Sequence, residues 1–343
     1  MTTRLGSRLT RIAQRRWPRA GLTAVAALAT VTAGAVTAGP SADAAAAPGT
    51  AYVVNSMNNT VTPVNLATRK LGAPIKVGKY PTSIAVTPDG KTAYVADYGG
   101  YEVTPVNLAT GKPGTPIQTP SHPVAIAIAP DGKTAYAACL SSGVIPISTA
   151  TNRVGKLIKT GEDPYAIAIT PDGRTAYVAD YLGAAVTPVN LATRKAGTPI
   201  HLGGQTTYPS GVAITPDGRT AYVTDYGTEA ITPVSVAARK PGTPIKAGPG
   251  PYAIAIAPDG KTAYVTDARG NTVTPVNLAT GKAGAPIKAG SNPFALAITP
   301  DGRTVYVVAR ASNEVIPINT ATRKPGTPIK VPGRPDAIAI VPN

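Results

Sequence analysis

A tyrosine recurs along this chain at intervals of 41 to 45 residues, and this period limits the possible folds more than any other feature. The seven positions are Tyr52, Tyr94, Tyr136, Tyr177, Tyr222, Tyr264 and Tyr306. Six of them follow a Pro-Asp-Gly triplet. A period near forty residues is typical of repeat proteins, in which each unit buries its faces only against its neighbours. The sequence therefore predicts seven copies of one structural unit.

One unit, residues 123–160, shows how the chain runs within each copy. Alanine and isoleucine alternate from Ala125 to Ile128, which predicts a strand with small side chains on one face and branched ones on the other. Pro130-Asp131-Gly132 suits a tight turn, because proline presets φ and glycine accepts a positive φ. Three further short strands follow, with no helical period. Four antiparallel strands per unit predict the blade of a β-propeller.

The two ends of the chain complement each other. The chain finishes with Asp336-Ala-Ile-Ala-Ile, the pattern of a first strand, whereas Ala51-Tyr52 resumes the repeat just after the turn. We therefore predict an all-β, seven-bladed propeller of four-stranded antiparallel blades, closed by pairing of N- and C-terminal strands within one blade. The predicted blades are residues 51–78 plus 333–343 (the split blade) and about 80–119, 122–160, 164–204, 208–248, 251–290 and 293–331.

Proline occurs in the predicted third strand of every unit, as at Pro63 and Pro105. A proline cannot donate a backbone hydrogen bond, so a fully paired strand would lose one bond of its ladder there. We expect a bulge or a short pairing at these positions. The predicted fourth strands carry a proline and a lysine, as at Pro74 and Lys76, which discourages pairing with other chains at an exposed edge.

The repeat resembles the YVTN family of β-propeller repeats, also called YncE-like. The likeness is carried by the segment Thr-Pro-Asp-Gly-Lys-Thr-Ala-Tyr-Val-Ala-Asp, Thr87 to Asp97, and by its counterparts as far as Arg303 to Val308. The resemblance implies a secreted or surface-located seven-bladed propeller, and it brings no agreed catalytic residues. The third strand departs from the family pattern, because this chain has Thr-Pro-Val-Asn where the family usually has a Val-Ile-Asp-type segment.

Residues 1–44 differ from the rest of the chain. Six arginines precede an Ala/Thr/Val/Gly stretch, and Ala42-Asp43-Ala44 fits the small-x-small pattern of a cleavage site. We predict a secretory signal peptide over residues 1–44 and a single propeller domain over residues 45–343. A retained membrane anchor is the alternative, and Arg15-Arg16 leaves both the Sec and the twin-arginine route open. The predicted product is secreted or extracytoplasmic, monomeric, and without a membrane span once cleaved.

The predicted topology separates the charges. Without residues 1–44 the chain carries 27 basic and 16 acidic side chains, a formal charge of +11. The Pro-Asp-Gly turns and the turns between third and fourth strands share one face, which holds 17 of the basic residues and six of the aspartates. The candidates for binding a polyanion are Lys91, Lys133, Arg174, Arg219, Lys261 and Arg303. A cationic face can hold a polyanion; the alternative is that these are simply solvated turn residues. No aromatic residue interleaves with them, which favours an anionic envelope polymer over nucleic acid.

The opposite face holds the loops in which the repeats differ. Variable loops on a rigid scaffold are the usual place for binding. The candidates for contacting a ligand or partner are Tyr98, Tyr101, Tyr165, Tyr181, Tyr208, Tyr226, Tyr252, Phe294, Asp97, Asp180, Asp225 and Asp267. The alternative is that the aromatic residues fill gaps between blades and the aspartates cap their own turns.

The sequence offers few groups for catalysis. His122 and His201 are the only histidines and lie in non-adjacent units, and Cys139 is the only cysteine, so we expect no catalytic residues, no metal and no cofactor. We expect Cys139 to be a packed free thiol. The main hypothesis is an exported, non-catalytic binding protein for an unknown protein or envelope ligand. The alternatives are a lactonase- or lyase-type propeller enzyme, which requires convergent carboxylates at one mouth of the channel, and binding of a polyanion through the basic turns.

Overall fold

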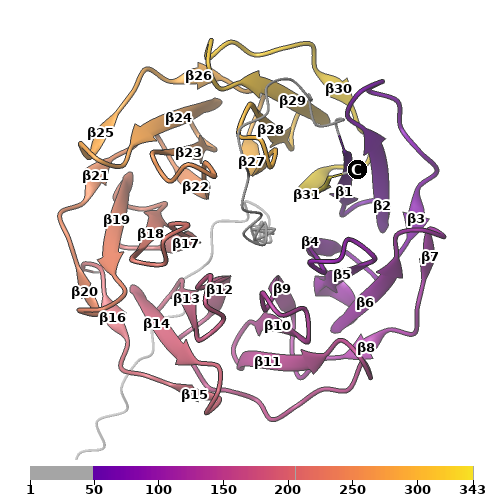
Figure 1. Cartoon of the computed structure of the whole chain (residues 1–343), viewed down its shortest axis with the longest axis horizontal. Helices are drawn as coiled ribbons and strands as arrows, with labels where there is room; N and C mark the ends of the chain where they lie inside the picture. Colours follow the sequence, from indigo (N-terminus) through magenta and orange to yellow (C-terminus); the bar gives the residue numbers. More distant parts are fainter. Residues whose placement is uncertain (1–48, 205, 343) are drawn as a thin grey trace, which may run out of the picture.

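The computed structural model describes residues 49–204 and 206–342, and these form the predicted seven-bladed β-propeller (Figure 1). Seven antiparallel sheets, which we number as blades 1 to 7 from the N-terminus, surround a central axis. The only helical element of this part of the chain is the 3-10 helix η1 (Tyr98–Gly100). The predicted signal peptide lies outside the described residues. No helix in the described part is long and apolar enough to cross a membrane.

Each blade contributes one inner strand to the wall around the axis. The inner strands are β31 (Pro335–Val341) of blade 1, and then β4 (Pro81–Val86), β9 (Pro123–Ile128), β12 (Pro164–Ile169), β17 (Pro209–Ile214), β22 (Pro251–Ile256) and β27 (Pro293–Ile298). The second strands are β1 (Thr50–Asn55), β5 (Thr92–Asp97), β10 (Thr134–Cys139), β13 (Thr175–Asp180), β18 (Thr220–Asp225), β23 (Thr262–Asp267) and β28 (Thr304–Ala309).

The third strands are also six residues long, whereas the outermost segments are only two residues each. The third strands are β2 (Thr60–Asn65), β6 (Glu102–Asn107), β11 (Gly143–Ser148), β14 (Ala185–Asn190), β19 (Ala230–Ser235), β24 (Thr272–Asn277) and β29 (Glu314–Asn319). The outer segments are β3 (Ile75–Lys76), β7 (Lys112–Pro113), β8 (Ile117–Gln118), β15 (Lys195–Ala196), β16 (Ile200–His201), β20 (Lys240–Pro241), β21 (Ile245–Lys246), β25 (Lys282–Ala283), β26 (Ile287–Lys288) and β30 (Ile329–Lys330).

The core lies between neighbouring blades. Both faces of the inner strands are covered, so that Ala125 and Ile126, which point to opposite faces, are each fully buried. The repeat tyrosines are buried as well, and Tyr94 of blade 2 donates a 2.9 Å hydrogen bond to Asn152 Oδ1 of blade 3. The alternating pattern therefore reflects blade-on-blade packing, and each unit depends on its neighbours.

Strands from the two ends of the chain close the ring. Strand β31 pairs antiparallel with β1, in register from Thr50 opposite Val341 to Val54 opposite Ala337. Beyond the strands, the Ser56 amide donates to the Arg334 carbonyl at 3.1 Å. Blade 1 therefore consists of β3, β2, β1 and β31, as predicted for the split blade.

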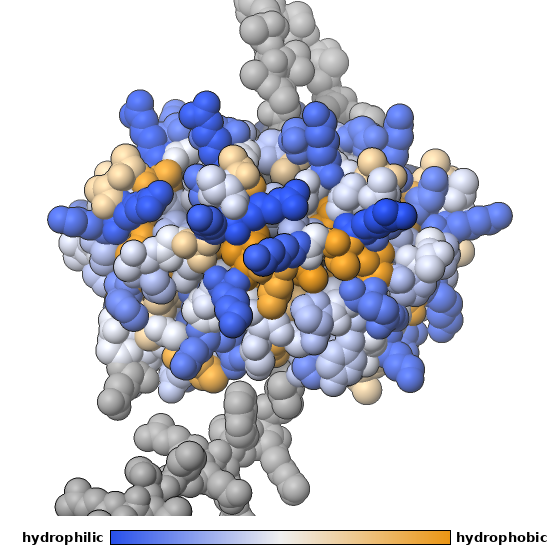
Figure 2. Space-filling model, turned by 90° about the horizontal axis from the view of Figure 1, so that it is seen from below, coloured by the Kyte–Doolittle hydropathy of each residue, from blue (hydrophilic) through white to orange (hydrophobic). Residues whose placement is uncertain are grey.

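The third-strand prolines shorten the outer pairing. Second and third strands pair without interruption, with Tyr94 opposite Pro105, but β7 and β8 pair only with the two ends of β6. At the gap, the Gly114 amide donates to the Pro105 carbonyl at 2.7 Å. A glycine in the same place makes this bond in every blade, at 2.7 to 2.8 Å. The expected short pairing thus occurs on the outer side of the third strand. Viewed from its edge, the disc shows hydrophilic side chains with small hydrophobic patches between them (Figure 2).

Hydrogen bonds assign the connections to two faces. On one face the Pro-Asp-Gly turns bond to the turns between third and fourth strands of the same blade, as in Leu191 N–H to Arg174 O at 2.9 Å. We call this the turn face. On the other face the loops after the second strands bond to the segments that lead into the inner strands, as in Tyr226 N–H to Tyr208 O at 3.1 Å. We call this the loop face.

Candidate functional site

Aromatic side chains gather on the loop face. The Tyr165 ring, from the start of β12, lies 4.8 Å from the ring of Tyr181, which in turn lies 5.2 Å from Tyr208. The Tyr165 hydroxyl is 2.7 Å from the Tyr252 hydroxyl. These two tyrosines belong to blades 4 and 6, and blade 5 has the small Ser210 at the equivalent position. Three blades therefore cooperate in one cluster.

The cluster continues into blades 5 to 7. Tyr226 packs edge-on against Tyr252 with ring centroids 6.3 Å apart, and Tyr252 lies 4.2 Å from Phe294. Tyr252 and Phe294 are buried, whereas Tyr165, Tyr181, Tyr208 and Tyr226 are partly exposed. Burial raises the pKa of Tyr181 to about 12, so its hydroxyl stays a neutral hydrogen-bonding group at neutral pH. The partly exposed rings thus rest on a buried aromatic base.

A second aromatic group lies on the loop face of blades 2 and 3. The His122 ring stacks on Tyr98 with centroids 4.3 Å apart and lies 4.2 Å from Tyr101, and its Nδ1 is 2.8 Å from the Tyr98 carbonyl oxygen. Tyr80 lies 6.1 Å from Tyr98, and its hydroxyl accepts a 2.7 Å hydrogen bond from Arg334. Tyr101 is exposed. His122 is therefore part of an aromatic stack.

A buried ion pair that the sequence interpretation missed adjoins the first cluster. The Arg310 guanidinium lies 4.0 Å from the Phe294 ring and forms an ion pair with Asp336 of the closing strand. The arginine is 4% exposed and the aspartate 0%. The two η nitrogens of Arg310 have no hydrogen-bond partner in the structure. The pair joins blade 7 to strand β31 of blade 1.

An alignment of the repeats contains the signal for this pair. Arg310 directly follows its second strand, at the position where other blades have Ser56, Tyr98, Leu140, Tyr181, Tyr226 and Ala268. Asp336 follows the proline that begins its inner strand, and the other blades have Thr82, Val124, Tyr165, Ser210, Tyr252 and Phe294 at this position. Each is the only charged residue in its series. Two charges at matching places in adjacent units predict contact between them.

The candidate aspartates lie beneath the loops. Asp97, Asp180 and Asp267 are fully buried, and Asp225 is 3% exposed. Each of the first three accepts a hydrogen bond from a threonine of its own blade, such as Thr104 Oγ1 to Asp97 Oδ2 at 2.5 Å. Asp225 accepts bonds from loop amides, including that of Tyr208 at 2.7 Å, and from the Thr228 hydroxyl. The carboxyl groups are thus hydrogen-bonded within their own loops and blades, and the tyrosines are the more accessible of the candidate groups on this face.

Burial changes the acidity of these carboxyl groups. Desolvation raises the pKa of Asp97 to about 8 and that of Asp180 to about 7, although the threonine hydrogen bonds act in the opposite direction. Desolvation also raises the pKa of Asp267. A carboxyl group with such a pKa is largely protonated in mildly acidic solution.

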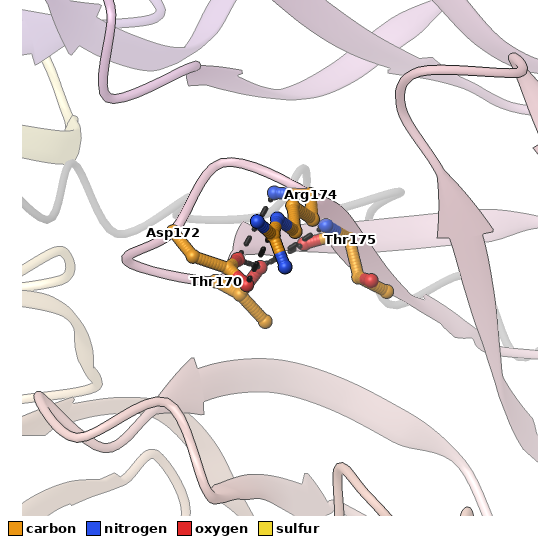
Figure 3. Close-up of polar contacts among 4 residues, drawn as sticks. All are labelled: Thr170, Asp172, Arg174 and Thr175. Carbon is orange, nitrogen blue, oxygen red and sulfur yellow. Dashed lines mark hydrogen bonds and ion pairs between the residues drawn. The ribbon is translucent and has the colours of Figure 1, made fainter.

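The candidate basic residues all project from the turn face. Lys91, Lys133, Arg174, Arg219, Lys261 and Arg303 are exposed. In blade 4 the acid of the turn is engaged locally: Asp172 Oδ1 accepts bonds from the Thr170 hydroxyl at 2.5 Å and from the Arg174 amide at 3.0 Å (Figure 3). The Thr170 hydroxyl oxygen also accepts a 3.0 Å hydrogen bond from the Thr175 amide. The repeated Pro-Asp-Gly motif therefore forms a turn whose hydrogen bonds are made within the turn itself.

The remaining candidate groups are dispersed. Cys139 is buried, as expected for a packed thiol, and burial raises its pKa to about 12. His201 is exposed at the outer edge of blade 4. Within the described residues, no three His, Cys, Asp or Glu side chains come together as a group that could hold a metal ion.

Comparison of folds identifies similar propellers in other proteins. Hydrazine synthase of Kuenenia stuttgartiensis matches with a TM-score of 0.74 and 24% identity, covering 84% of this chain and 99% of that one. A functionally unknown protein from Desulfotomaculum acetoxidans DSM 771 matches with a TM-score of 0.75 and 18% identity over 86% and 100% of the two chains. The periplasmic gluconolactonase PpgL of Pseudomonas aeruginosa has a TM-score of 0.72 and 17% identity over 85% and 99%. At such identities the likeness concerns the fold alone.

Sequence comparison identifies the family. No curated protein matches this sequence. The model of the YncE-like β-propeller family, in contrast, matches residues 14–341, which is nearly the whole chain. Together with the seven closed blades, this match shows that the chain belongs to the YncE-like β-propeller family.

Proposed function

We propose that this propeller is an exported, non-catalytic binding protein that holds a partner on its loop face. The observation that carries the proposal is the aromatic cluster on the loop face that joins Tyr165, Tyr181 and Tyr208 to Tyr226 and Tyr252. Partly exposed tyrosines combine a large apolar surface with a hydroxyl group, and for this reason they are enriched where proteins bind partners.

The distribution of sequence variation supports the same face. The turn face repeats almost the same residues in every blade, whereas the loop face has a different set in each. A surface made of unlike loops can recognise one asymmetric partner, and a rigid scaffold lowers the cost of ordering them on binding. Because the buried aspartates are bonded within their own blades, the face offers aromatic contact rather than converging carboxylates.

A capture experiment tests the proposal. Protein lacking residues 1–44 is immobilised and exposed to an extract of the native envelope, and the captured material is quantified for the parent and for a Tyr181→Ala/Tyr226→Ala variant. Both side chains are partly exposed, so the variant should keep the fold, which circular dichroism checks. We expect capture to fall at least tenfold, because losing two aromatic anchors costs about 2 kcal/mol or more.

A charge variant on the opposite side provides the control. Lys133→Gln/Arg174→Gln alters only exposed residues of the turn face and should leave this capture unchanged. Undiminished capture by the double tyrosine variant would overturn the proposal.

A further inference from the structure

The turn face carries the whole net charge of the propeller. Its two series of turns hold 17 basic residues and six aspartates, whereas the remaining charges of residues 45–343 balance. The basic side chains extend well into solvent, with 84% of the Arg174 side chain and 85% of the Arg219 side chain exposed. Cations that repeat at the same place in successive blades form a curved track around the ring.

The turn aspartates do not neutralise this track effectively. The nearest ion pairs, Arg174 Nε to Asp172 at 4.0 Å and Arg219 Nε to Asp217 at 3.9 Å, are long and solvent-exposed, and such pairs contribute little. Instead, each carboxylate accepts the amide two residues later, as in Arg219 N–H to Asp217 Oδ1 at 3.0 Å. The carboxylates are thus held against the backbone of the turns, and the guanidinium and ammonium groups project beyond them.

The hollow between the turns of blades 2 and 3 does not fit a small anion. One pocket of about 330 Å³ lies between blades 2 and 3 and is lined by Lys133, but Asp89 and Asp131 line it as well. Two carboxylates beside one ammonium group repel a compact anion. Attraction on this face therefore comes from many separated cations acting together, which favours a long polyanion over a small one.

The same face lacks a stacking surface. The exposed large apolar residues of the described chain are Met57, Leu71, Tyr101, Val154 and Leu182. Tyr101 is the only aromatic residue among them, and it lies on the loop face. The repeat tyrosines near the turns are buried. Proteins that bind single-stranded nucleic acids normally add stacking to charge, so this face suits a chain of charges without bases.

We propose that the turn face is a second, independent interaction surface, which binds a linear polyanion through its ring of basic turns. The track passes Lys91, Lys133, Arg174, Arg219, Lys261 and Arg303 in order. It is interrupted at blade 1, where no Pro-Asp-Gly turn joins the inner strand β31 to the second strand β1. Recognition depends on the spacing and number of charges and not on a pocket.

The test uses protein lacking residues 1–44 and a linear polyphosphate long enough to span several turns. One variant replaces the six track residues by glutamine. A matched control removes the same charge from the outer segments and the loop side by replacing Lys76, Lys79, Lys159, Lys246, Lys288 and Lys330, which are all exposed. Affinity is measured by fluorescence anisotropy over a range of salt concentrations.

We expect the parent protein to bind the polyphosphate with a steep dependence on salt. In the track variant, the magnitude of the slope of log Kobs against log salt should fall by about four, because six contacts are lost and each contributes about 0.7 to the slope. The control should keep most of the slope. An oligothymidylate of equal charge should bind no more tightly than the polyphosphate, and inorganic phosphate should not compete at equal charge concentration.

Three results would overturn the proposal: equal loss in the two variants, tighter binding of the oligothymidylate, or effective competition by inorganic phosphate. Because the loop face is unaltered in the track variant, its capture of an envelope partner should persist. The proposal for the loop face and the proposal for the turn face can therefore be refuted independently.

Discussion

Arg310 and Asp336 form a buried ion pair beneath the loop face, and single changes there should be costly. Asp336→Asn leaves the Arg310 guanidinium 4% exposed and without its ionic partner. Breaking a buried pair in this way typically costs about 3–5 kcal/mol. We therefore expect the midpoint of urea unfolding to fall markedly in Asp336→Asn.

Replacing both partners separates the charge from the packing. In Arg310→Met/Asp336→Leu no uncompensated charge remains, and apolar replacement of a buried pair is often neutral or stabilising. The double variant should recover most of the stability that Asp336→Asn loses. If the two proteins unfold at the same urea concentration, the pair does not act as an ionic link between blade 7 and the closing strand.

The buried carboxyl groups give the propeller a pH-dependent stability. An unfolded aspartate has a pKa near 3.9, whereas the folded values are about 8 for Asp97 and about 7 for Asp180. Between these limits each of the two groups binds more protons in the folded protein than in the unfolded chain, so their contribution to stability is fully present below the unfolded pKa and is lost as the pH rises to 7–8. Denaturant unfolding at pH 5, 6.5 and 8 should show this decline.

Asp97→Asn/Asp180→Asn should flatten the same profile. Asparagine is close in shape to the protonated acid and keeps an oxygen for the threonine hydroxyl, so the variant should lose little stability at pH 5 and gain relative to the parent at pH 8. Asp131→Asn, in an exposed turn, is the control and should leave the decline unchanged. A decline that survives in the double variant would assign the effect to other groups.

At this scale the sequence predicted residue types better than contacts. The aromatic loop residues were identifiable because they interrupt a repeat, and the charges of Arg310 and Asp336 were visible in the same way. The bond between Tyr165 and Tyr252 was not, since it skips a blade and depends on how far two side chains reach across Ser210. Nor did the sequence show that Asp97 and Asp180 would be buried, because Asp after a strand is equally common in an exposed turn.

Within each blade, a glycine and a proline explain how the outer strand can be interrupted. The glycine amide bonds to the proline carbonyl, and a Cβ on Gly114 would lie 3.1 Å from Pro105 Cγ. The equivalent distance is 3.0 to 3.4 Å in the other blades. The missing side chain lets the connection cross closely over the proline ring, which covers the gap in the ladder.

Gly114→Ala should therefore destabilise the protein, by about 1–3 kcal/mol as is usual for overpacking at a close contact. Gly204→Ala is the control, because no atom of the described residues beyond its own chain neighbours lies within 4 Å of its Cβ position. Thermal unfolding should separate the two variants clearly. Equal midpoints would show that the connection moves aside at little cost.

The element pattern itself was largely predictable. Strict alternation, as in Ala125 to Ile128, and the Pro-Asp-Gly turns indicate strands and hairpins directly. The fourth strands were harder to predict. Their two-residue segments form where the outer chain pairs with the third strand on either side of Pro105 and its counterparts, and no local sequence pattern marks these segments.

At the scale of the whole molecule, ring closure separates a turn face that carries the charge from a loop face that carries the aromatic residues. Both binding proposals depend on this separation, and an open array would lose contacts between the two ends of the ring, such as the hydrogen bond from Arg334 to the Tyr80 hydroxyl. The closure was predictable because the segment from Asp336 has the pattern of a first strand, and the repeat resumes at Ala51-Tyr52 with the pattern of a second strand.

Cross-linking of the terminal strands tests this closure most directly. Thr50 lies opposite Val341, so a Thr50→Cys/Val341→Cys variant should form an intramolecular disulfide on mild oxidation of the native protein. Thr50→Cys/Ala339→Cys places the thiols two residues out of register, about 7–8 Å apart, and should not. Peptide mapping under non-reducing conditions measures both yields. Near-complete cross-linking in the first variant alone is the result we predict, and equal yields, or cross-links only between molecules, would contradict a ring closed by β1 and β31.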